Sequence, residues 1–231
     1  MAITAYLAMT AAEVRNPSSI PEKIAWMACH FSPYSTGISN LPENLPEGSM
    51  LILNDVTPIH GHDPERIAKQ LTKSIKDNKC MGLLLDFQRE GYPELEALAK
   101  YLNNALPCPV AYFGEHNGPV FLPPVPCHVP IEEYITKWKN REIWLEVALD
   151  RKAILLTESG SRECTPPLTR TACQHRDSRL HCSYDITVQP GQVLFSMQRT
   201  VDDLQDLLSE AEELGVQKAF GLYQELGEFF L

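Results

Sequence analysis

The feature that most restricts the fold of this chain is an alternation of apolar runs and amphipathic segments between residues 50 and 113. Three runs have the composition of strands: 50–54, 81–87 and 109–113. Between them, apolar side chains recur at helical spacing over residues 64–78 and 94–105. The middle run is apolar on both faces, as in a buried parallel strand. This order predicts parallel strands joined by right-handed helical crossovers.

The rest of the sequence continues this pattern less regularly. Further strands are predicted at 23–31, 120–122 and 218–223, and helices at 131–138 and 201–214. Two β-hairpins are predicted because each pair of strand-like runs flanks a short turn: 142–149 with 153–157, and 181–188 with 192–198. The polar segment 159–179 is interpreted as a long loop.

Six to eight strands with helices between several of them predict an α/β fold. We expect one domain over residues 1–231, an irregular (β/α)8 TIM-type barrel in which two β-hairpins replace regular units in 140–200. The alternative is a doubly wound open sheet. That fold usually carries a glycine-rich phosphate loop, and the sequence has no G-x-G-x-x-G or Walker-type motif. No cofactor is therefore expected.

Composition restricts the partners and the compartment. The 231 residues carry a formal net charge of -10, which argues against nucleic acid and anionic membrane surfaces as partners. There is no apolar run of membrane-spanning length and no recognisable signal peptide. The seven scattered cysteines fit reduced thiols in a cytoplasmic protein. A metal site at His60-Gly61-His62 is not expected, because the adjacent Asp63 is better explained as a helix cap.

Candidate site residues follow from the rule that a barrel places its site at the carboxyl ends of the strands. The rule selects residues at five strand ends: His30 and Tyr34, Asn54 and Asp55, Asp86 and Gln88, Glu115 and His116, and Gln224 and Glu225. Asp86, Asp55 and Glu225 are the candidates for catalysis, and Asp55, Asp86, Gln88, Gln224 and Glu225 are candidates for binding a ligand. For two other acidic residues we predict an ordinary structural position and no role in a site. Glu115 is expected in a turn, and Glu146 is expected to face solvent on a hairpin.

The segment 81–88, MGLLLDFQ, resembles the D-G-x-D-x-D-x-E motif on the fourth barrel strand of the family-18 glycoside hydrolases, the chitinase type. Gly82 and Asp86 match the motif, and the closing GLYQELGEF is loosely similar to the family's last strand. Gln88 stands where the family has the glutamate that protonates the leaving oxygen. Leu84 replaces a neighbouring aspartate. A glutamine has no titratable proton near neutral pH, so the resemblance implies that this general-acid chemistry is lost.

Three functions are compatible with these residues. The first is a glycosidase-like barrel that binds a saccharide or another small polar ligand through Asp86 and Gln88. In that barrel the resemblance implies stacking surfaces at Tyr34, Tyr112 or Tyr223. The second is an active glycoside hydrolase whose carboxylates come from other strand ends. The third is a structural or interaction protein without enzymatic activity. The sequence leaves the oligomeric state open.

Overall fold

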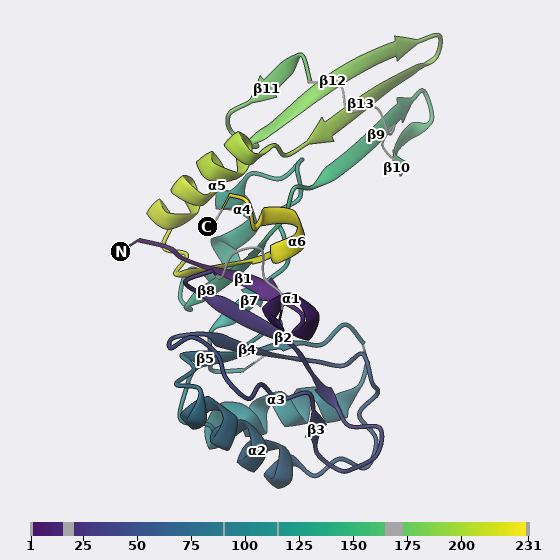
Figure 1. Ribbon diagram of the computed structural model, residues 1–231. Helices are drawn as coiled ribbons and strands as arrows, with labels where there is room; N and C mark the ends of the chain where they lie inside the picture. Colours follow the sequence, from purple (N-terminus) through teal and green to yellow (C-terminus); the bar gives the residue numbers. More distant parts are fainter. Residues whose placement is uncertain (1, 16–20, 90, 115, 165–172, 230–231) are drawn as a thin grey trace.

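A closed barrel of eight parallel strands forms the body of the computed structural model, which describes residues 2–15, 21–89, 91–114, 116–164 and 173–229 (Figure 1). In spatial order the strands are β1 (Thr4–Met9), β2 (Ile24–Phe31), β4 (Met50–Asn54), β5 (Gly82–Asp86), β6 (Val110–Tyr112), β7 (Val120–Leu122), β8 (Ile143–Val147) and β14 (Lys218–Leu222). β1 pairs with both β2 and β14 and closes the ring. The predicted TIM-type barrel is confirmed, and the open-sheet alternative is wrong.

Helices cover the outside of the barrel. They are α1 (Ala11–Arg15), α2 (Pro64–Asp77), α3 (Pro93–Ala105), α4 (Ile131–Ile135) with the 3-10 turn η1 (Thr136–Trp138), α5 (Val201–Glu213) and α6 (Tyr223–Leu226). α2 begins where the sequence predicts, because the Asp63 side chain accepts a hydrogen bond from the Glu65 N–H. α5 begins with a reciprocal capping box between Thr200 and Asp203. Among the described residues, no helix is long and apolar enough to cross a membrane.

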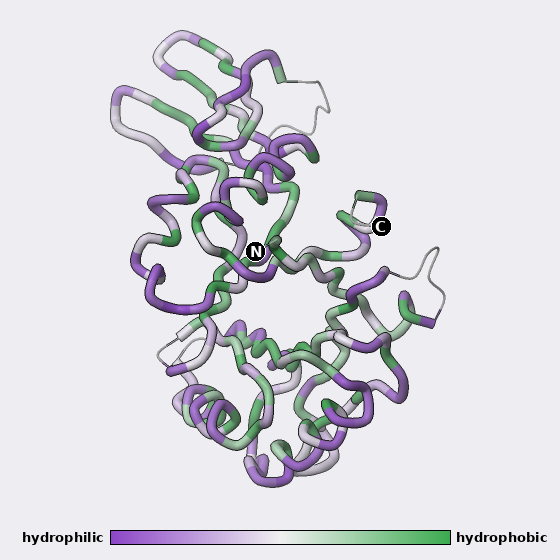
Figure 2. Tube along the Cα trace, turned by 90° about the vertical axis from the view of Figure 1, so that its left-hand side faces the viewer, coloured by the Kyte–Doolittle hydropathy of each residue, from purple (hydrophilic) through white to green (hydrophobic). Residues whose placement is uncertain are grey.

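The strand β5 shows how alternation sorts side chains between the two sides of the barrel wall. Leu83 and Leu85 pack outward into the core shared with α2 and α3, whereas Leu84 packs in the barrel interior. Gly82 is required there, because a Cβ atom at this position would lie 2.8 Å from both Met50 Cε and Trp144 Cη2. The strands form a closed and largely apolar ring in Figure 2. The interior below the mouth is thus filled by side chains, as is usual for this fold.

A five-stranded antiparallel sheet is inserted between β8 and α5 and projects from the barrel in Figure 1. Its strands, in spatial order, are β10 (Gly160–Cys164), β9 (Arg151–Thr157), β13 (Gln192–Gln198), β12 (Cys182–Gln189) and β11 (His175–Asp177). A short strand, β3 (Ile38–Ser39), separately pairs antiparallel to β2. Arg199 anchors the inserted sheet, since its buried guanidinium donates to the carbonyls of Val125 and His181.

The inserted region corrects part of the sequence interpretation. The hairpin predicted from 181–188 and 192–198 is confirmed as β12 and β13. The hairpin predicted from 142–149 and 153–157 is wrong: β8 pairs parallel with β7 and β14, and β9 pairs with β10 and β13. Parts of the predicted loop 159–179 form β10 and β11, and β1 was not predicted. The segment at Asp150 resembles a hairpin turn in the sequence. In the structure it is where the chain leaves the barrel and enters the inserted sheet.

Candidate functional site

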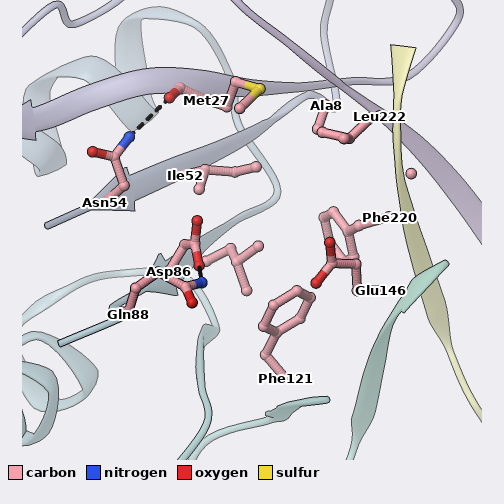
Figure 3. Close-up of a pocket in the computed structure, with 12 residues that line it drawn as sticks. Ala8, Met27, Ile52, Asn54, Asp86, Gln88, Phe121, Glu146, Phe220 and Leu222 are labelled. Carbon is pink, nitrogen blue, oxygen red and sulfur yellow. Dashed lines mark hydrogen bonds between the residues drawn. The ribbon is translucent and has the colours of Figure 1, made fainter. Parts of the chain in front are cut away.

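A pocket opens at the carboxyl ends of the barrel strands, with a cavity of about 90 Å³ that is open to solvent on one side. Seven of the eight barrel strands, or the residues that directly follow them, contribute to its wall. The lining residues are Ala8, Met27, Ile52, Asn54, Leu84, Asp86, Gln88, Phe121, Glu146, Phe220, Gly221 and Leu222 (Figure 3). This is the end of the barrel at which the fold places active sites.

Asp86 and Gln88 both line this pocket, on the side formed by β5. Gln88 Nε2 donates a hydrogen bond to Asp86 Oδ1, which fixes the two side chains against each other. Burial raises the pKa of the Asp86 carboxyl, the bond from Gln88 opposes this shift, and the charge of Asp55 adds to it. Asp86 and Gln88 are two residues apart in the sequence, and their side chains therefore both face the cavity.

Asp55 lies behind this pair and does not line the pocket. It is 2% exposed, and its two carboxylate oxygens accept hydrogen bonds from the Gln88 and Arg89 N–H groups, each at 2.9 Å. A buried carboxylate that satisfies two backbone donors holds the chain that follows β5 in place. In the structure, Asp55 thus positions Gln88 rather than reaching the cavity itself.

Glu146 lies on the opposite side of the pocket, which corrects the expectation that it faces solvent on a hairpin. β8 is a barrel strand, and Glu146 lies two residues after Trp144, so both side chains point into the barrel. Burial, together with the negative charges of Asp86 and Glu225, raises the pKa of the Glu146 carboxyl to about 7. The alternation within EIWLEV was the sequence signal that could have revealed this position.

The two aromatic residues of the pocket were also missed by the sequence analysis. Phe121 and Phe220 meet edge to face with ring centroids 6.0 Å apart, and Phe220 stacks on Trp144 at 5.6 Å. They form an apolar surface beside Glu146 in Figure 3. Pockets of this kind, apolar with a few fixed polar groups, are typical of small-ligand sites.

The other predicted site residues lie outside the pocket lining. Glu225 accepts a hydrogen bond from the Leu149 N–H at 2.7 Å, and Gln224 is exposed beside it on α6. Tyr223 packs against the core below α5. Tyr112 contacts the Phe87 and His116 rings, and Tyr34 is 95% exposed. Binding roles for these residues stay predictions, and the Glu115 turn falls outside the described residues.

Metal ligands do not gather in this region. Across the described part of the chain, no group of three or more His, Cys, Asp or Glu side chains could hold a metal ion. His62 instead lies within hydrogen-bond distance of the Ser32 carbonyl, at 3.1 Å. The polar side chains that line the pocket are those of Asn54, Asp86, Gln88 and Glu146.

No protein-family model and no curated protein matches the sequence. Solved structures match over nearly the whole chain. A family-18 N-acetylglucosaminidase from Paenibacillus barengoltzii is 7% identical with a TM-score of 0.60, and the match covers 95% of this chain and 94% of that one. A chitinase from Chromobacterium violaceum is 9% identical with a TM-score of 0.55, covering 99% and 97%.

A chitinase-like agglutinin from Robinia pseudoacacia is 12% identical with a TM-score of 0.53, covering 94% of this chain and 93% of that one. The fold is therefore that of the family-18 chitinases and chitinase-like proteins. β5 is the fourth strand of the barrel, the strand on which the resemblance places the family motif. The resemblance drawn from segment 81–88 is confirmed at the level of the fold.

Proposed function

We propose that the pocket at the barrel mouth binds a saccharide or another small, uncharged polar ligand, and that position 88 supplies a hydrogen bond rather than a proton. The observation that carries this proposal is the Asp86–Gln88 pair, which faces the cavity opposite the Phe121 and Phe220 rings. An amide and a carboxylate can together donate to and accept from sugar hydroxyls. The apolar rings complement the C–H face of a sugar ring.

The electrostatics of the pocket favour an uncharged ligand. Asp86 and Glu146 both line it, Glu225 lies close enough to influence Glu146, and the chain as a whole carries a net charge of -10. An anionic ligand would be repelled by these charges. Two of the matched structures are those of a chitinase and a chitinase-like agglutinin, which supports the same ligand class.

Isothermal titration calorimetry of the full chain against neutral mono- and oligosaccharides, with and without N-acetyl groups, tests the proposal. Saturable binding that is weakened in Gln88→Ala and unchanged in Gln205→Ala is the expected result. Gln205→Ala is a matched control because it removes an exposed glutamine on α5, outside the pocket lining. Absence of saturable binding across the panel at millimolar concentrations would overturn the proposal.

The interaction role considered from the sequence remains a second candidate function, because the inserted sheet exposes apolar residues. Leu156, Ile186 and Val188 are 38%, 44% and 75% exposed. The strand register places all three on one face: Val188 pairs with Val193, Leu156 pairs with Val193 on the other side, and Ile186 lies two residues before Val188. Light scattering on the protein and on a Val188→Asp variant distinguishes an associating chain from a monomer.

A further inference from the structure

Glu146 differs from the other polar side chains of the pocket in its hydrogen bonding. Asn54 donates to the Met27 carbonyl at 3.0 Å, and Gln88 donates to Asp86. For the carboxyl of Glu146, no hydrogen-bond partner is found among the described residues, although the side chain is half-buried and lines the cavity. A half-buried carboxyl that lacks a hydrogen-bond partner and lines a cavity can form a hydrogen bond with a ligand.

The surroundings of Glu146 also suit a group that exchanges protons. The Phe121 and Phe220 rings line the same cavity, and burial is the main cause that raises the pKa of this carboxyl to about 7. At neutral pH the group is therefore present in comparable amounts as acid and as carboxylate. General acids work best when their pKa lies near the operating pH. A carboxyl with a strongly perturbed pKa in a cleft is a candidate for a functional group.

Asp86 provides a second carboxyl on the other side of the pocket, in a different environment (Figure 3). Burial raises the pKa of the Asp86 carboxyl as well, and the hydrogen bond from Gln88 opposes this shift and fixes the orientation of the carboxyl group. Two carboxyl groups that flank one cavity are the arrangement used for acid and base roles in glycoside hydrolysis.

We propose that this pocket hydrolyses a glycosidic bond, with Glu146 as the general acid and Asp86 as the general base. The inference rests on the saccharide binding proposed above and adds a reaction to it. Glu146 protonates the glycosidic oxygen as its bond to the anomeric carbon breaks, and the bonding electron pair stays with that oxygen. A water molecule attacks the anomeric carbon and gives its proton to Asp86. Exchange with solvent returns the proton to Glu146 and completes the cycle.

Gln88 is a positioning residue in this scheme, since it acts on the reaction through Asp86. Its amide cannot give up a proton, but its hydrogen bond keeps Asp86 oriented as a base. The proton donor thus comes from β8, four residues before Asp150, and not from the end of β5 where the family resemblance would place it.

The test measures turnover of aryl glycosides by the full chain, together with release of reducing ends from oligosaccharides. Glu146→Gln is expected to lower kcat about 10²- to 10⁴-fold while sugar binding measured by calorimetry persists. The loss should be much smaller with 2,4-dinitrophenyl glycosides, whose leaving group needs no proton. A purely structural role would reduce turnover of all substrates alike. Glu132→Gln, an exposed carboxyl on α4, is the matched control and should retain full activity.

The pH profile gives a second readout, because kcat/KM should fall as the pH rises through about 7, where Glu146 loses its proton. Saccharide binding without turnover by the unmodified chain would overturn the hydrolysis and leave the binding proposal intact. Turnover that is unchanged in Glu146→Gln would overturn the assignment of the acid. Failure of both binding and turnover would refute the two proposals together.

Discussion

At the end of β5 the polar side chains are held by hydrogen bonds, whereas on β8 Glu146 has no hydrogen-bond partner among the residues that the structure describes. Asp86 is bonded to Gln88, and the backbone of Gln88 is bonded to the buried Asp55. Glu146 projects from a strand of apolar residues into the same pocket. The segment with the recognisable motif is therefore the more extensively hydrogen-bonded half of the site, while the carboxyl whose pKa is about 7 lies in a segment without such a motif.

The largest expected effect is on stability and comes from removing Asp55, whose carboxylate holds the segment that follows β5. Asp55→Ala would leave the Gln88 and Arg89 N–H groups without their acceptors, and we expect the free energy of unfolding to fall by about 2–4 kcal/mol. Urea denaturation measures this loss. Asp55→Asn keeps one carbonyl acceptor and should lose about half as much. If both variants are as stable as the parent chain, the segment after β5 does not depend on Asp55.

The next effect concerns β8 and depends on pH. The folded chain raises the pKa of Glu146 from 4.5 to about 7, so it holds this proton more tightly than the unfolded chain does. The stabilisation from the protonated carboxyl is complete below about pH 4.5 and is lost as the pH rises through 7. Glu146→Gln cannot ionise, so at pH 8.5 we expect it to exceed the parent chain in stability by about 1–3 kcal/mol.

Unfolding measured at pH 5, 7 and 8.5 checks this prediction. The advantage of Glu146→Gln should grow with pH over this range. Glu132→Gln, which removes an exposed carboxyl from α4, should show no such trend. A stability difference that is constant across the three pH values would mean that Glu146 does not titrate in this window.

A smaller effect is expected for the hydrogen bond inside the β5 pair. Gln88→Ala removes the donor to Asp86 and one group that faces the ligand, so affinity for a bound saccharide should fall about five- to tenfold. Calorimetry of the variant measures the change. An affinity within twofold of the parent chain would show that the ligand does not depend on the Asp86–Gln88 pair.

The smallest effect is expected at Tyr34. Its side chain is 95% exposed and does not line the pocket, so Tyr34→Ala should change affinity less than twofold and stability by less than about 0.5 kcal/mol. The same calorimetry and urea unfolding check this. A clear loss of affinity would mean that the ligand extends past the barrel mouth to the segment after β2, as stacking on Tyr34 requires.

The elements that were predicted well are those with strong local signals. The helix at 64–78 carried an N-cap at Asp63 and an apolar stripe, and α2 spans Pro64–Asp77. β4 and β5 were read from apolar runs bounded by turns, and both lie within one residue of the predicted ends. Placement of Asp86 and Gln88 at the barrel mouth followed from the rule for strand ends, which depends on β5 alone.

Glu146 could not be placed in the same way, because its position depends on which strands pair with β8. A run such as IWLEV alternates equally well in a hairpin and in a barrel wall. The polar residues after Leu149 resembled a turn between paired strands. In the structure they lead out to the inserted sheet, and β8 pairs with β7 and β14 instead.

The sequence by itself determined the barrel, the residues at the end of β5 and the absence of an acid at position 88. These features follow from the composition and periodicity of short segments, and both can be read directly from the sequence. Only the tertiary structure decided that Phe121, Phe220 and Glu146 share the cavity with Asp86. Those residues are far apart in the sequence, and the raised pKa of Glu146 arises from burial among strands that meet only when the barrel closes.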